Sequence, residues 1–142
     1  MNTLLSILLA SIFIAISGLH FYWVLGGRWA MNAVVPTKAD SGDLTFSPPP
    51  IATIVVALGL LLMAWISLAI AGLLDFPLSA AWVRGGMIGV ASIFALRAVG
   101  DFKYVGLSKK IKSTPFGRND TRYYTPLCIL IFTLSSTLLW LN

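Results

Sequence analysis

The chain has few of the side chains on which enzymatic chemistry depends. Its 142 residues include one histidine, one cysteine (Cys128) and no glutamate. A single cysteine excludes an intrachain disulfide bond and a zinc site built from cysteine pairs. The sequence has no glycine-rich loop followed by lysine that could bind phosphate groups. Metal-dependent, hydrolytic and kinase-like activities are therefore disfavoured, and we expect no metal ion and no cofactor.

Charge is also scarce, whereas apolar residues are abundant. Charged residues make up 11% of the chain and hydrophobic residues 58%, and the mean hydropathy is +0.88. Soluble domains are about 25% charged and about 45–50% apolar. The composition therefore predicts an integral membrane protein. A chain of this length is expected to form a single domain over residues 1–142, without room for a separate soluble domain.

Four apolar segments are long enough to cross a bilayer, which takes about 20 helical residues. We expect them at about residues 3–25, 51–74, 80–99 and 124–141. The third holds Arg84 and Arg97, separated by twelve uncharged residues. These cover about 18 Å, so both arginines must reach outward to the headgroups. Thr125 and Pro126 are typical of the start of a helix. The predicted fold class is all-α: a polytopic membrane protein with four transmembrane helices in one bundle.

The distribution of basic residues predicts the orientation in the membrane. Four spans put the connections 26–50 and 100–125 on one side and both termini on the other. Because cytoplasmic loops are enriched in lysine and arginine, we expect both long connections in the cytoplasm and both termini outside the cell membrane. The basic residues should contact anionic lipid headgroups rather than nucleic acid. In the two connections they are Arg28, Lys38, Lys103, Lys109, Lys110, Lys112, Arg118 and Arg122.

Polar residues near the cytoplasmic ends of the spans form the candidate binding site, which comprises His20, Trp23, Arg97, Asp101 and Lys103. His20 lies near the end of the first span. Arg97 and Asp101 are four residues apart and so share one face of the third helix. We expect them to form an ion pair, which would serve either to terminate the helix or to bind an anion. For His20, a structural hydrogen bond and a role in ligand contact or proton transfer both remain open.

Three sequence blocks resemble a known family. They are HFYWVLGG (20–27), RAVGDFKYVGL (97–107) and DTRYYTPLC (120–128). Together they resemble the small four-span bacterial membrane proteins of the domain-of-unknown-function 3995 family. The resemblance implies a four-helix bacterial membrane protein, and it implies no activity, substrate or site residue.

Three functions are compatible with the sequence. The first is a small bundle that binds a lipid or an anionic amphiphile at its cytoplasmic mouth, where Trp23 would form an apolar wall. The second is a structural or accessory subunit, as a homo-oligomer or with a membrane partner, whose polar groups fix helix packing. The third is an enzyme acting on a lipidic substrate, with His20 as general acid or base and Asp101 orienting it. We favour binding or accessory roles over catalysis because the polar residues are so few.

Overall fold

The computed structural model of the protein describes residues 1–36, 47–75, 77 and 79–142, and these residues form helices and no strands. Each of four long helical segments is long and apolar enough to cross a membrane, so the chain is a multi-pass membrane protein. Lys38, one of the residues used to predict orientation, lies outside the described residues. The helices are α1 (Asn2–Val24), α2 (Met31–Val34), α3 (Pro50–Ile70), α4 (Ala80–Val99), α5 (Pro115–Asn119), the π-helix η1 (Asp120–Tyr124) and α6 (Thr125–Leu141).

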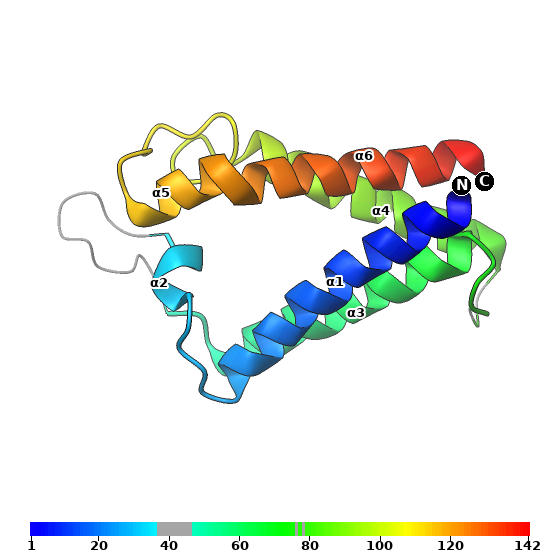
Figure 1. The fold of residues 1–142 in the computed structure, drawn as a ribbon, viewed down its shortest axis with the longest axis horizontal. Helices are drawn as coiled ribbons and strands as arrows, with labels where there is room; N and C mark the ends of the chain where they lie inside the picture. The colour runs from blue at the N-terminus through cyan, green and yellow to red at the C-terminus, as the bar shows by residue number, and fades with distance from the viewer. Residues whose placement is uncertain (37–46, 76, 78) are drawn as a thin grey trace.

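The long helices form two pairs that diverge from one end of the molecule. Helix α1 packs along α3, and α4 packs along α6 (Figure 1). Both termini lie where the pairs converge, and Asn2 Nδ2 donates a hydrogen bond to the Leu141 carbonyl oxygen there (3.3 Å). We call this the narrow end, and the opposite end, which carries α2 and α5, the wide end. As predicted, the termini lie at one end of the molecule and the described parts of both long connections lie at the other.

The hydrophobic core fills only the narrow half of this wedge. Its buried residues come from the parts of all four long helices that are nearest the narrow end: Leu9, Ala10, Phe13, Leu60, Ala64, Ile66, Val83, Met87, Val90, Ile131, Leu134 and Leu138. Gly86 of α4 brings the two pairs close together, because a Cβ atom there would lie 3.0 Å from Ile66 Cδ1 of α3. Within the first pair, the buried Ser17 hydroxyl donates to the Ala57 carbonyl oxygen (2.8 Å). Close packing therefore joins the pairs at the narrow end.

The four predicted spans agree with the observed long helices in position. Helix α4 covers residues 80–99 as predicted, and α1 differs from its prediction by one residue at each end. Pro50 occupies the first turn of α3, where its missing N–H leaves no bond unmade. Helix α3 ends at Ile70 rather than residue 74, because Gly72 adopts a left-handed conformation (φ +69°) that the helix cannot continue through.

Helix α6 matches the predicted fourth span, residues 124–141, to within one residue, but Thr125 and Pro126 do not begin the helical structure. Helical structure begins at Pro115, and the Thr114 side chain caps it by accepting a hydrogen bond from the Gly117 N–H (3.0 Å). The chain then passes through η1, where the Thr125 N–H donates to the Asp120 carbonyl oxygen five residues back, directly into α6. Pro126 has no N–H to donate, so a widened turn before it leaves the helix continuous.

Candidate functional site

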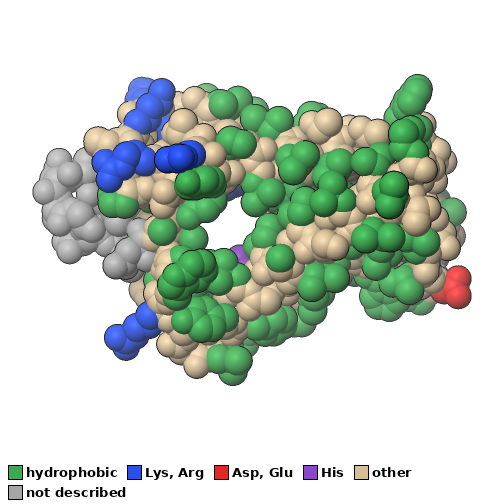
Figure 2. All heavy atoms as spheres, in the orientation of Figure 1, with side chains coloured by type: hydrophobic (Ala, Val, Ile, Leu, Met, Phe, Trp, Pro, Cys, Tyr) green, Lys and Arg blue, Asp and Glu red, His purple; other side chains and the backbone are tan. Residues whose placement is uncertain are grey.

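A cavity of about 680 Å³ occupies the wide half of the wedge, between the two helix pairs. Figure 2 shows the opening between the pairs, with the chain's single histidine, in purple, at its edge. Most of the wall is apolar, and the polar side chains in it are those of His20, Thr53, Arg97 and Tyr124. Because the helix axes run roughly across the view, the opening faces lipid when the helices span a bilayer. The other lining residues include Ile16, Leu19, Trp23, Val24, Met31, Val34, Pro49, Val56, Leu60, Phe94, Leu127 and Cys128.

The His20 ring is fixed within its own helix. Its Nδ1 atom lies 2.8 Å from the Ile16 carbonyl oxygen, one turn back. Because a carbonyl oxygen only accepts, Nδ1 carries the proton and Nε2 is left to interact with another group. The ring also meets the Trp23 ring edge-on, with centroids 5.0 Å apart, and Trp23 Nε1 donates to the Trp29 carbonyl oxygen (2.9 Å). These contacts hold both rings as parts of the cavity wall.

Arg97 pairs with a different carboxylate from the one predicted. It lies in the last turn of α4, and its Nη2 atom is 3.0 Å from Asp120 Oδ1 of η1. The predicted ion pair with Asp101 is therefore wrong. One third of the Arg97 side chain is exposed, and its Nη1 atom is buried without an acceptor among the described residues. The guanidinium thus forms part of the cavity wall and keeps unused donor capacity.

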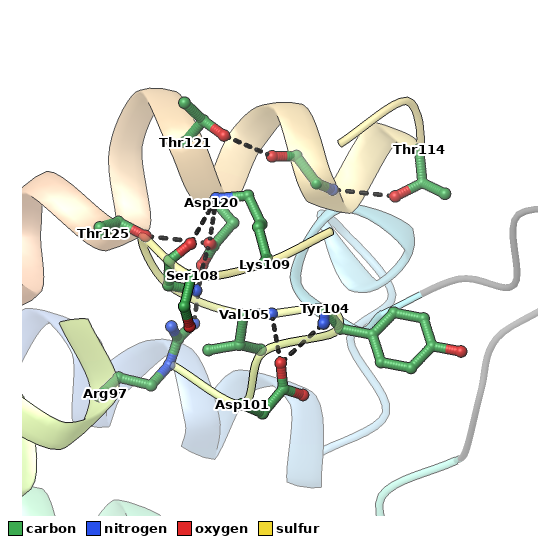
Figure 3. Close-up of polar contacts among 12 residues, drawn as sticks. Arg97, Asp101, Tyr104, Val105, Ser108, Lys109, Thr114, Asp120, Thr121 and Thr125 are labelled. Carbon is green, nitrogen blue, oxygen red and sulfur yellow. Dashed lines mark hydrogen bonds and ion pairs between the residues drawn. The ribbon is translucent and has the colours of Figure 1, made fainter. Parts of the chain in front are cut away.

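Asp120 is the centre of a buried polar cluster at the wide end (Figure 3). Besides Arg97, its carboxylate accepts from Lys109 Nζ (2.8 Å), the Gly106 N–H (2.9 Å) and the Thr125 hydroxyl (2.9 Å). The Lys109 side chain is only 3% exposed and that of Asp120 is fully buried. Lys109 is therefore unavailable as a lipid-facing anchor, unlike its exposed neighbours Lys110 and Lys112. The carboxylate links α4, η1, α6 and the segment between them.

That segment, residues 100–114, folds back over the end of α4, and we call it the cap. The Leu107 and Ser108 N–H groups donate to the Ala98 and Val99 carbonyl oxygens (2.8 and 3.1 Å), which the helix leaves unpaired. Two glycines permit this close return. A Cβ atom on Gly106 (φ +80°) would lie 2.5 Å from the Gly100 Cα atom. The cap is thus a defined structure rather than a loose basic loop.

Asp101 shapes the cap and does not face the cavity. Its Oδ1 atom accepts from the backbone N–H groups of Lys103, Tyr104 and Val105 (2.9, 2.7 and 2.9 Å; Figure 3). Burial acts to raise the pKa of the Asp101 carboxyl, but these N–H groups lower it by more, so the pKa lies below its ordinary value of 3.8. The Lys103 ammonium lies over the Tyr104 ring, 5.1 Å from its centroid.

The structure therefore brings together three of the five predicted site residues. His20, Trp23 and Arg97 line the cavity, whereas Asp101 and Lys103 do not. No hydrogen bond joins His20 to Asp101 in the described part of the chain, so the acid–base pair suggested for an enzyme is not formed. The residues described also contain no cluster of three metal-ligating side chains.

Sequence reasoning missed Asp120 and Lys109 as members of one cluster. The available signal was the position of Asp120 ahead of a long apolar run, since an ionised carboxylate there requires partners. Lys109 was interpreted as one member of a basic run with Lys110 and Lys112. Only its contact with the buried Asp120 distinguishes it from them, and the sequence does not show that contact. Thr53 and Tyr124 also went unrecognised as lining residues, because nothing in the sequence shows that the helix pairs diverge.

Comparison with known proteins supplies a family and no activity. No curated protein matches the chain, and no solved structure matches it either. A family model described as "Protein of unknown function (DUF3995)" matches residues 13–134, which is most of the chain. The resemblance found in the three sequence blocks is thereby confirmed, and the protein belongs to the DUF3995 family.

Proposed function

We propose that the protein binds a membrane lipid or an anionic amphiphile in the cavity between its helix pairs. The observation that supports this most directly is the cavity itself. Its volume of about 680 Å³ falls within the range of ligand-binding sites, about 300–1,000 Å³. Its wall is apolar over most of its area, with a few polar groups gathered near the wide end. This is the pattern of a site for an elongated apolar group with a polar head.

The surroundings of the cavity favour an amphiphile over a water-soluble ligand. Water gains little in a space lined by leucine, valine and phenylalanine side chains, whereas an apolar chain is stabilised there. The opening between the pairs faces lipid, so a membrane amphiphile can enter without leaving the bilayer. In the bound state we place the chain along α1 and α3, and the head near His20 Nε2 and Arg97.

The proposal includes a location for the site in the cell. By the positive-inside rule, the wide end lies on the cytoplasmic side of the cell membrane and both termini lie outside. Exposed basic residues of the cap and of α5, including Lys110, Lys112 and Arg118, then contact anionic headgroups of the inner leaflet. A reporter fused to the C-terminus tests this orientation. A reporter accessible only from the cytoplasm would show that the orientation is wrong.

Trp23 provides a direct assay of binding because it lines the cavity. Three amphiphiles that share a dibromostearoyl chain and a glycerol unit serve as probes: a lysophosphatidate, a lysophosphatidylcholine and a monoacylglycerol. Bromine quenches a neighbouring indole, so binding of any one of them should quench Trp23 fluorescence saturably in protein held in neutral detergent. The saturable part should disappear in Trp23→Phe. It should persist in Trp82→Phe, which removes an exposed tryptophan of α4 outside the cavity.

A structural or accessory role is the second candidate. It is favoured by two internal hydrogen bonds. The His20 ring bonds to the Ile16 carbonyl oxygen, and the Ser17 hydroxyl bonds to the Ala57 carbonyl oxygen. This role predicts no saturable quenching by any of the three probes, together with a loss of thermal stability in His20→Ala. Such a pair of results would refute the binding proposal.

A further inference from the structure

The buried cluster behind the cavity wall contains more positive than negative charge. It holds two cations, Arg97 and Lys109, and one carboxylate, Asp120. The other groups bonded to that carboxylate, the Gly106 N–H and the Thr125 hydroxyl, are neutral. The cluster therefore has a formal charge of +1, with Lys109 and Asp120 buried and Arg97 one third exposed. An isolated charge in such partly buried surroundings attracts a counter-ion strongly, because the effective dielectric constant is low.

The described residues offer no carboxylate that offsets this charge. Asp75 lies in the connection at the narrow end and is exposed. Asp101 is exposed too, and the oxygen through which it bonds is taken up by three N–H groups of the cap. Its charge is thus stabilised by backbone donors and water rather than by Arg97.

Arg97 connects the cluster to the cavity. Its side chain lines the cavity and is one third exposed, while its Nη2 atom holds Asp120. Its Nη1 atom has no acceptor in the part of the chain that the structure describes. A buried donor without an acceptor destabilises the folded state, and a modest rotation of the guanidinium would let an oxygen in the cavity accept from it. Arginine is well suited to this task because its planar group can bind both oxygens of a carboxylate or phosphate.

We propose that the ligand of the cavity carries an anionic oxyacid headgroup, a carboxylate or a phosphate monoester, which binds at Arg97. The surplus charge of the Arg97–Lys109–Asp120 cluster selects this headgroup over zwitterionic and uncharged ones. In this scheme Arg97 touches the ligand, whereas Lys109 acts through the cluster without contact. The inference rests on the proposed function, because it specifies the headgroup of the amphiphile bound there.

The three brominated probes test the inference because they differ in the headgroup alone. The lysophosphatidate should bind about tenfold more tightly than the other two, or better, as expected of a charge-assisted hydrogen bond. Arg97→Gln should bring the three affinities within about twofold of one another, whereas Arg97→Lys, which keeps the charge but loses the planar group, should retain only part of the preference. Equal affinities of the unchanged protein for all three would overturn the inference and leave the proposed function standing. Absence of binding by all three would refute both.

Two lysine variants separate the charge of the cluster from the general basicity of the cap. Lys109→Met removes the buried ammonium and should lower the preference for the anionic probe at least threefold, with little change for the uncharged one. Lys110→Met makes the same change at an exposed neighbour and should leave the preference unaltered. If the Lys110 variant alone lowers the preference, surface attraction is the cause and the inference is wrong. If a variant fails to fold, the headgroup preference of the unchanged protein still decides.

Discussion

Replacement of Asp120 by asparagine is the most informative perturbation of this structure. The side chain keeps its size but loses its charge, and its amide nitrogen cannot accept the bonds that one carboxylate oxygen now accepts. That oxygen, Oδ2, receives bonds from Lys109 Nζ, the Gly106 N–H and the Thr125 hydroxyl. With the amide oxygen turned toward Arg97, all three donors would lose their acceptor. With the opposite rotamer, Arg97 would lose its partner instead.

The loss of stability expected in Asp120→Asn follows from the burial of the Lys109–Asp120 ion pair. Lys109 is 3% exposed and Asp120 fully buried, so the substitution leaves a buried ammonium without its counter-ion. Removal of one partner of a buried ion pair destabilises the structure by about 3–5 kcal/mol. The Arg97 link adds less, because that side chain is one third exposed and its charge is partly screened. The effect should be local, since Asp120 holds the cap to the helices while the core lies in the other half of the molecule.

Hydrogen exchange in the cap measures this local stability. A loss of about 3 kcal/mol should raise the amide exchange rates of residues 100–112 more than a hundredfold, while those of the core helices change little. Asp75→Asn makes the same chemical change at an exposed site and should leave exchange unchanged. Addition of Lys109→Met to Asp120→Asn should recover part of the loss, because the unpaired charge is gone. Unchanged exchange in Asp120→Asn, or strictly additive effects of the two substitutions, would refute the reasoning.

Three further predictions concern the backbone and helix contacts. Gly106→Ala should open the cap, since the residue has φ +80° and an added Cβ atom would collide with backbone. Faster hydrogen exchange in the cap would report the opening. Gly18→Ala should leave exchange in the cap unchanged, because an added Cβ atom there meets open space. Ser17→Ala should lower thermal stability in detergent by about 1 kcal/mol through loss of the bond to the Ala57 carbonyl. Because the pKa of Asp101 is lowered by folding, its contribution to cap stability should be constant above pH 3.8 and decline only as pH falls below that value. Asp101→Asn should abolish this decline, and protease resistance of the cap measures it.

The spans could be predicted from sequence because membrane helices are specified by composition and length. Apolar runs and flanking prolines located α1, α3, α4 and α6 to within a few residues. The helical segment 115–124, which precedes the fourth span, was missed although the chain contains two Thr-Pro pairs, at 114–115 and 125–126. Both look like helix starts, and only tertiary contacts decide between them. Thr114 is free to cap, whereas the Thr125 hydroxyl is committed to Asp120.

The candidate site was harder to predict because it depends on contacts between distant segments. Helical spacing predicted that Arg97 and Asp101 share one face, but α4 ends at Val99, so Asp101 lies beyond the helix. Asp101 finds three N–H groups within its own loop, and Arg97 finds Asp120, 23 residues further on. The cavity itself could not be predicted from the sequence, because it arises from the angle between helix pairs rather than from any local pattern.

The contact between Gly86 and Ile66 has a mechanical consequence for the cavity. It lies where the two helix pairs converge, in the narrow half of the molecule. Because the pairs diverge from this point, a small increase in their separation here becomes a larger increase at the wide end. A methyl group added at Gly86 should therefore widen the mouth by more than it displaces Ile66. The width of the cavity is thus governed by Gly86 and Ile66, two residues of the narrow half that do not line it.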